Sequence, residues 1–148
     1  MNVDIKKILL VEDNPNDAEL TLEALRSKNL ANDIIWLKDG QEALDFLYCQ
    51  DAYAGREPIN PVLILLDIKM PRVDGFQVLK QVKADPKLRA IPVVILTSSR
   101  EESDLLEGYN HGVNAFVVKP VNFQDFMHSV SSLGAFWAVL NEAPLTRV

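Results

Sequence analysis

Short runs of apolar residues alternate along the chain with segments in which apolar residues recur at helical spacing. The apolar runs span residues 8–11, 34–37, 62–66, 92–96 and 115–118. Runs of four or five aliphatic and β-branched residues, without polar alternation, are typical of strands that are buried on both faces. The pattern therefore predicts five strands of a parallel sheet.

One segment with helical spacing follows each of these strands. The apolar stripes are Ala18, Leu22 and Leu25; Ala43, Leu44 and Leu47; Phe76, Leu79 and Val82; Leu105, Leu106 and Tyr109; and Phe123, Phe126, Met127, Val130 and Leu133, with a continuation toward Leu140. The first helix is expected to begin near Asn14 and Pro15, and the third to end before Asp85. Five strand–helix repeats predict right-handed crossovers and an α/β sheet with helices on both faces.

The chain of 148 residues fits one domain, because no linker, repeat or change of composition divides it. The longest loop is predicted over residues 50–61, and a frayed tail over residues 143–148. Cys49 is the only cysteine, which excludes an intramolecular disulfide. We expect it to be a small, half-buried residue.

The charge of the chain bears on its partners. The net charge is −6, from 21 acidic and 15 basic residues, and no basic run is present. This argues against direct binding of nucleic acid, which needs a concentrated basic face. The N-terminal residues lack the apolar stretch of a signal peptide, and no apolar run has the length of a membrane span. We therefore expect a cytoplasmic protein without a membrane partner.

Acidic residues follow two of the predicted strands directly. Glu12 and Asp13 come after the first strand, and Asp67 follows the third. In an open parallel sheet, ligands bind at the carboxyl ends of the strands, near the point where the strand order reverses. Three carboxylates gathered there would repel one another without a cation, and oxygen ligands suit Mg²⁺. The alternative is that each acid only caps a strand or begins a turn.

Two further strand ends carry a hydroxyl group and an ammonium group. Thr97 and Ser98 follow the fourth strand, and Lys119 and Pro120 follow the fifth. A hydroxyl and a cation can bind the oxygens of a phosphoryl group, and a carboxylate can act as the nucleophile that accepts it. Taken singly, Lys119 would more often be a surface lysine, and Thr97 an ordinary strand residue.

These residues lie within longer motifs: LLVEDN at residues 9–14, LLDIKMPRVDG at 65–75, LTS at 96–98 and VKP at 118–120. In their order and spacing the chain resembles the receiver domains of two-component response regulators over about residues 6–134. The resemblance implies a flavodoxin-like (βα)5 fold, a doubly wound five-stranded parallel sheet of order 2-1-3-4-5. Residues 1–148 would then be one receiver domain, with a C-terminal helix extension and tail over 135–148.

The resemblance also implies a metal site and a phosphoacceptor. Asp67 would accept the phosphoryl group. Mg²⁺ would be bound by Asp13 and Asp67, by Glu12 directly or through water, and by the backbone carbonyl of Lys69. Glu12 is longer than the aspartate that is usual at its position, so a less direct coordination of the metal is expected there.

Four other positions receive roles from the resemblance. Thr97 and Lys119 would bind phosphoryl oxygens, and the peptide bond before Pro120 would be cis. Phe116 matches an aromatic position that rotates inward when the threonine hydroxyl moves toward the phosphoryl group. Its alternative role is that of a core phenylalanine. Ser98 stands where alanine is common.

The segment after residue 134 is too short for an output domain, so the output is expected through a partner protein, a homodimer or phosphorelay. The chain further resembles the stand-alone regulators that are paired with cyanobacterial and bacterial phytochrome kinases. That resemblance implies a sensor histidine kinase as the partner and a homodimer through the last strand and helix. The apolar residues Phe136, Trp137, Val139 and Leu140 would either cap the core or form that interface.

Competing functions have weaker support in the sequence. Phosphohydrolases of the haloacid-dehalogenase type need a second acid two positions after the nucleophile, where this chain has Lys69. A nucleotide-binding loop rich in glycine is lacking after the first strand. A receiver that binds partners without phosphorylation remains the alternative. His111 and His128 are expected to be surface residues, with the phosphodonor histidine on the kinase. We expect no enzyme beyond slow self-dephosphorylation.

Overall fold

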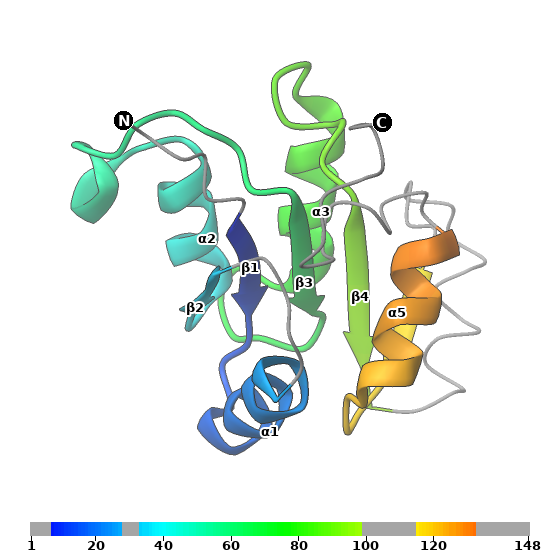
Figure 1. The fold of residues 1–148 in the computed structure, drawn as a ribbon. Helices are drawn as coiled ribbons and strands as arrows, with labels where there is room; N and C mark the ends of the chain where they lie inside the picture. The colour runs from blue at the N-terminus through cyan, green and yellow to red at the C-terminus, as the bar shows by residue number, and fades with distance from the viewer. Residues whose placement is uncertain (1–6, 28–32, 99–114, 133–148) are drawn as a thin grey trace.

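The computed structural model describes residues 7–27, 33–98 and 115–132. Within them, five parallel strands form one sheet of order β2-β1-β3-β4-β5 (Figure 1). The strands are β1 (Lys7–Val11), β2 (Asp33–Leu37), β3 (Leu63–Asp67), β4 (Val93–Thr97) and β5 (Ala115–Val118). The helices are α1 (Pro15–Arg26), α2 (Gly40–Leu47), α3 (Gly75–Ala84) and α5 (Phe123–Ser132), with a short 3-10 helix η1 (Asp51–Tyr53). The predicted strand order is confirmed.

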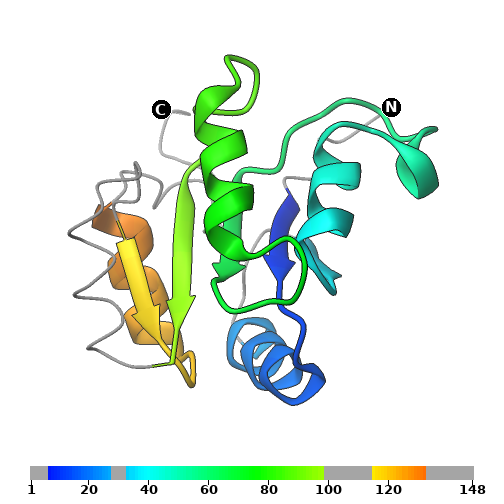
Figure 2. The ribbon, with the colours of Figure 1, turned by 180° about the vertical axis from the view of Figure 1, so that it is seen from behind.

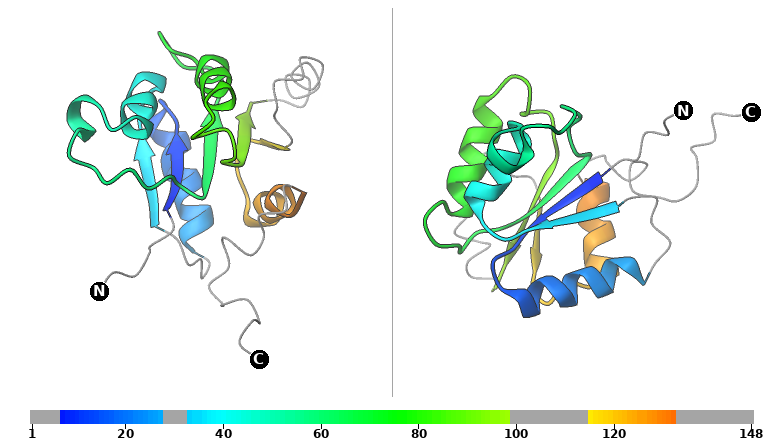
Figure 3. Two further views of the ribbon diagram at one scale, coloured as in Figure 1. Left: turned by 90° about the horizontal axis from the view of Figure 1, so that it is seen from above. Right: turned by 90° about the vertical axis from the view of Figure 1, so that its left-hand side faces the viewer.

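Helices cover both faces of the sheet, which explains the unbroken apolar runs. Helices α2 and α3 pack on one face and α1 and α5 on the other (Figures 2 and 3). In β1, Leu9 and Val11 belong to the core on the α2 and α3 side, while Ile8 and Leu10 belong to the opposite core. The central strands β3 and β4 are buried along their whole length. Every position of such a strand is therefore apolar until the strand ends.

The register of the strands brings their carboxyl ends to one edge of the sheet. In the β1–β3 pair Val11 lies opposite Leu66, and in the β3–β4 pair Asp67 lies opposite Leu96. The residues that follow β1 and β4 are therefore neighbours of Asp67 at the end of β3. The topology thus gathers the polar strand ends predicted from the sequence.

The helix starts are fixed by side-chain caps. The Asn14 side chain accepts a hydrogen bond from the backbone N–H of Asp17, and Pro15 occupies the first turn of α1, as predicted. Helix α3 begins with a capping box formed by Asp74 and Gln77, and it ends at Ala84, with Asp85 as its C-cap before a proline. The predicted stripe around Leu105 and Tyr109 lies outside the described residues.

The loop predicted over residues 50–61 contains the 3-10 helix η1 and is anchored by Arg56. The Arg56 guanidinium lies 4.0 Å from the centre of the Phe46 ring and donates to the Phe46 carbonyl oxygen at 2.9 Å. Cys49, just before the loop, is half-buried as expected.

Among the described helices, none has the length and apolar character needed to cross a membrane.

One glycine brings α3 close to the end of β3. The Gly75 N–H donates to the Ile68 carbonyl oxygen at 3.0 Å. A Cβ atom at Gly75 would collide with the backbone of Asp67 and Ile68. The close approach of the loop after Asp67 to the start of α3 therefore requires glycine at this position.

Candidate functional site

Three carboxylates meet at the carboxyl ends of β1 and β3. Oxygen atoms of Glu12, Asp13 and Asp67 all lie within 4.8 Å of one another. Glu12 is fully buried, Asp67 is 5% exposed, and Asp13 is exposed. The cluster predicted from the strand ends is therefore present, with two of its acids inside the protein and one at its surface.

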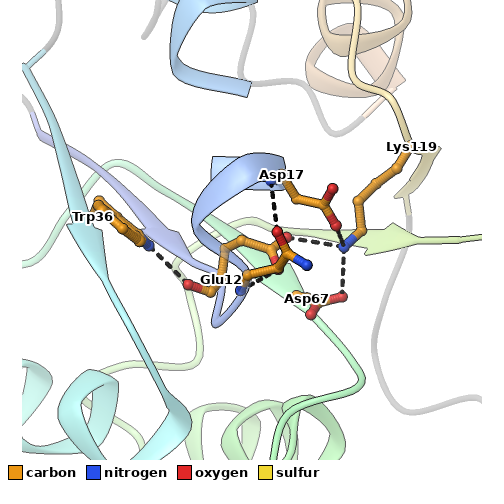
Figure 4. Close-up of polar contacts among 6 residues, drawn as sticks. Glu12, Asp17, Trp36, Asp67 and Lys119 are labelled. Atoms are coloured by element: carbon orange, nitrogen blue, oxygen red, sulfur yellow. Dashed lines mark hydrogen bonds and ion pairs between the residues drawn. The ribbon is translucent and has the colours of Figure 1, made fainter. Parts of the chain in front are cut away.

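The Lys119 ammonium lies among these carboxylates (Figure 4). Its Nζ is 2.9 Å from Glu12 Oε1, 3.0 Å from Asp17 Oδ2 and 3.3 Å from Asp67 Oδ1. Lys119 follows β5, and its backbone N–H donates to the Thr97 carbonyl oxygen at 2.8 Å, which extends the β4–β5 pairing by one residue. The peptide bond from Lys119 to Pro120 is cis, as the resemblance implied.

Both carboxylate oxygens and the carbonyl oxygen of Glu12 have partners. Oε1 accepts a hydrogen bond from the Lys119 ammonium, and Oε2 accepts one from the Asn14 N–H at 3.1 Å. The Trp36 indole N–H donates to the Glu12 carbonyl oxygen at 2.7 Å. A buried acid needs such compensation, because its desolvation is costly. Glu12 is thus held in place from β2, α1 and β5.

The protonation of the cluster reflects burial. Burial raises the pKa of Glu12 to about 7, although the hydrogen bond from Lys119 acts in the opposite direction. Burial also raises the pKa of Asp67, against the charge of Lys119. Burial alone would lower the pKa of Lys119, but its hydrogen bonds to Glu12 and Asp17 and the nearby negative charges raise it. One ammonium therefore compensates the buried carboxylates only in part, which favours a further cation.

An open, polar hollow of about 400 Å³ surrounds these groups. It is lined by Glu12, Asp13, Asn14, Pro15, Asp17, Asp67, Lys69, Ser98 and Lys119. Thr97, one residue before Ser98, is fully buried at the end of β4. The structure therefore brings the predicted residues from β1, β3, β4 and β5 to one place.

The donor atoms of this hollow fit Mg²⁺. All three ligand groups of the cluster are carboxylates, and the hollow is open enough to leave room for waters, as a magnesium ion requires. Lys69, two residues after Asp67 in the chain, also lines the hollow. Which atoms coordinate an ion stays a prediction.

The profile of the response regulator receiver domain matches residues 8–131. The chain belongs to this family. The receiver domain is 54% identical to the bacteriophytochrome response regulator AtBRR, with a TM-score of 0.89 over 95% of this chain and 100% of that one. The resemblance that the motifs carried is therefore confirmed at the level of the family, and so is the resemblance to regulators associated with phytochromes.

Two curated relatives extend the comparison. The probable methanogenesis regulatory protein FilR2 of Methanothrix harundinacea is 41% identical over 93% of this chain and 86% of its own length. Response regulator Rcp1 of Synechocystis is 39% identical over 89% of this chain and 88% of its own length. A Mn²⁺-bound form of Rcp1 has a TM-score of 0.70 to this receiver domain, at 39% identity over 89% of this chain and 94% of that one.

Some sequence predictions fall elsewhere in the receiver domain. Phe116 is half-buried on β5 and packs against the core on the α2 and α3 side, a position that both of its proposed roles allow. His128 is exposed on α5, as expected for a surface histidine. The predictions for His111 and for the apolar residues 136–140 lie outside the described residues.

The sequence prediction missed two contacts of the site, those of Asp17 and Trp36. Asp17 carried one usable signal, because the first turn of a helix that follows a strand at this edge faces the same hollow. Trp36 carried none, since a tryptophan within an apolar run is equally well a core residue.

Proposed function

We propose that this receiver domain is a signalling switch that accepts a phosphoryl group on Asp67 from a partner histidine kinase, with Mg²⁺ as cofactor. The observation that carries the proposal is the Lys119 ammonium at 3.3 Å from the buried Asp67 carboxylate, within an acidic hollow open to solvent. A nucleophile beside a cation, at an edge where a second cation fits, suits phosphoryl transfer.

Glu12, Asp13, Asp67 and the Lys69 carbonyl would hold the magnesium ion. When bound, Mg²⁺ would neutralise negative charge that gathers around the transferred group. The Asn14 N–H holds one carboxylate oxygen of Glu12, and the Trp36 indole N–H holds its backbone carbonyl. Such fixed partners reduce the reorganisation that ligands undergo when an ion arrives.

Asp67 would act as the nucleophile of the transfer. One of its carboxylate oxygens forms a bond to phosphorus while the bond from phosphorus to the donor's imidazole nitrogen breaks. The electron pair of the broken bond stays on that nitrogen. Lys119 would donate to one phosphoryl oxygen and the Thr97 hydroxyl to another, so that two donors meet the developing charge.

The output would be conformational rather than catalytic. Because Thr97 is fully buried at the end of β4, movement of its hydroxyl toward a phosphoryl oxygen would alter packing around Phe116, which lies opposite Ile95 of β4. We expect no enzymatic activity beyond slow loss of the receiver's own phosphoryl group.

A phytochrome-type histidine kinase is the partner that the likeness to AtBRR supports. FilR2 bears the name of a probable methanogenesis regulatory protein, so a role outside phytochrome signalling is the alternative. The signal would pass to a downstream protein or to a second copy of the chain, through β5 and the last helix, and the site of action would be the cytoplasm.

The proposal is tested by intact mass after incubation with acetyl phosphate, with and without Mg²⁺. We expect a single phosphoryl adduct that requires Mg²⁺ and is lost in Asp67→Asn. An Asp74→Asn variant, changed at a carboxylate outside the hollow, should form the adduct as the wild type does. If no phosphodonor produces an adduct, the chain acts as a phosphorylation-independent interaction module instead.

A further inference from the structure

Lys119 has one carboxylate partner that does not belong to the metal cluster. Among the described residues, the acids that meet closely enough to share one ion are Glu12, Asp13 and Asp67. Asp17 is not among them, yet its Oδ2 lies 3.0 Å from Lys119 Nζ, closer than the 3.3 Å to Asp67. An ammonium has three N–H donors, and three carboxylates surround this one.

The position of Asp17 is fixed by the start of α1. Its backbone N–H donates to the Asn14 side chain at 3.0 Å, and the Asn14 N–H in turn donates to Glu12 Oε2 at 3.1 Å. The Asp17 side chain is 38% exposed and reaches into the hollow from the rim (Figure 4). The capped first turn of α1 thus presents a carboxylate to Lys119 from the side opposite Asp67 (Figure 4).

We propose that Asp17 is a positioning residue that holds the Lys119 ammonium toward α1 in the resting protein and so slows phosphoryl capture on Asp67. This inference rests on the proposed function. A cation in the hollow would attract the oxygens of Glu12 and Asp67, which frees Lys119 from them. Asp17 lies outside the cluster and keeps its contact, so Lys119 must weaken that contact before it donates to a phosphoryl oxygen.

The rate of phosphorylation by acetyl phosphate at saturating Mg²⁺, followed by intact mass, tests this inference. Because a half-exposed ion pair is weak, Asp17→Asn should raise the rate about two- to fivefold, and Asp17→Glu should restore the wild-type rate. Asp125→Asn is the matched control. Asp125 has the same place in the first turn of α5, where the Asn122 side chain accepts its N–H at 2.8 Å. Its rate should equal that of the wild type.

A double-mutant cycle separates the positioning of Lys119 by Asp17 from simple repulsion between the Asp17 charge and the anionic phosphodonor. In a Lys119→Met background, Asp17→Asn should leave the residual rate unchanged, because the residue through which Asp17 acts is gone. A rise that persists in that background would overturn the inference, and so would an unchanged or lower rate in Asp17→Asn alone. Failure of the proposed function looks different, since the wild type itself would then take up no phosphoryl group.

Discussion

Two cationic side chains, Lys119 and Arg56, contact distant parts of this fold. The partners of one are charged and those of the other are neutral. Lys119 lies at the carboxyl ends of the strands, with its side chain 14% exposed, and its partners are the carboxylates of Glu12, Asp17 and Asp67. Arg56 lies in the loop before β3, which runs beside the amino ends of the strands (Figure 1). The partners of Arg56 are neutral groups.

The guanidinium of Arg56 donates to three backbone carbonyl oxygens, those of Phe46, Glu57 and Ile59, at 2.9, 3.0 and 2.9 Å. It also stacks on the Phe46 ring. A bound metal ion or phosphoryl group does not compete for these partners. The carboxylates around Lys119 are different, because a divalent cation attracts the same oxygens. We therefore expect the contacts of Arg56 to stay the same when ligands arrive, whereas those of Lys119 can be exchanged.

The largest difference between the two cations should appear in phosphorylation. Lys119→Met removes a fixed donor next to Asp67, and we expect the phosphorylation rate to fall about 100-fold, the usual effect of losing one such donor. Arg56→Met leaves the hollow intact, and we expect its rate to stay within about twofold of the wild type. Both rates are measured by intact mass with acetyl phosphate and Mg²⁺. Equal losses in the two variants would contradict the division drawn between them.

The change of stability with pH should originate in the carboxylates at the carboxyl ends of the strands, where Lys119 lies. The pKa of Glu12 is raised from 4.5 to about 7 by burial, so the native state binds more protons than the unfolded state between these values. The free energy of unfolding of the metal-free protein should therefore fall as pH rises from 4.5 to 7, by on the order of 2 kcal/mol. Urea unfolding at several pH values measures this slope.

Two variants serve as controls for that slope. Glu12→Gln should remove most of the fall, because the titrating group is gone. Arg56→Met should keep it at the wild-type size, since Arg56 does not contact Glu12. A wild-type stability that rises steadily from pH 4.5 to 7 would show that Glu12 is not protonated in the native state.

The affinity for Mg²⁺ should also depend on the protonation of Glu12. Ligand carboxylates must be deprotonated, so protons compete with the ion at Glu12 below its pKa of about 7. We expect the Mg²⁺ dissociation constant to rise about tenfold between pH 8 and pH 6. Titration of tryptophan fluorescence in a Trp137→Phe variant, where Trp36 alone emits, follows the binding, since the Trp36 indole N–H contacts the Glu12 carbonyl oxygen. A dissociation constant that does not change with pH would exclude proton competition at this acid.

The fold could be predicted from the sequence because local and global signals agree. Runs such as residues 62–66 have no polar position, and only a strand covered on both faces needs that pattern. The caps at Asn14 and the stop at Asp85 were predictable for the same reason, since each depends on a few neighbouring residues. The 3-10 helix η1 was not, because its Tyr53 contacts Phe46 and Glu42 of helix α2, and such contacts between elements are not visible in a local pattern.

The candidate site was predictable in its membership but not in its resting geometry. Glu12, Asp13 and Asp67 could be grouped because parallel strands end at one edge of the sheet. The sequence motif assigned Lys119 to a phosphoryl group, yet in the structure its shorter contacts are to Glu12 and Asp17. The ion pairs that Lys119 forms without a ligand depend on distances between side chains and on burial. A sequence motif contains neither kind of information.

The smallest effect is expected at Arg56 itself, and it concerns stability alone. Arg56→Met removes three hydrogen bonds and a ring contact, but it also removes Nη2, which is buried without a hydrogen-bond partner among the described residues. Because losing that unsatisfied donor offsets part of the damage, we expect a loss of only about 1 kcal/mol in the free energy of unfolding. The loss should be the same with and without Mg²⁺, measured by urea unfolding. Arg89→Met, at an exposed arginine, is the control, and a loss at Arg56 that Mg²⁺ reverses would mean that the two ends of the sheet are coupled.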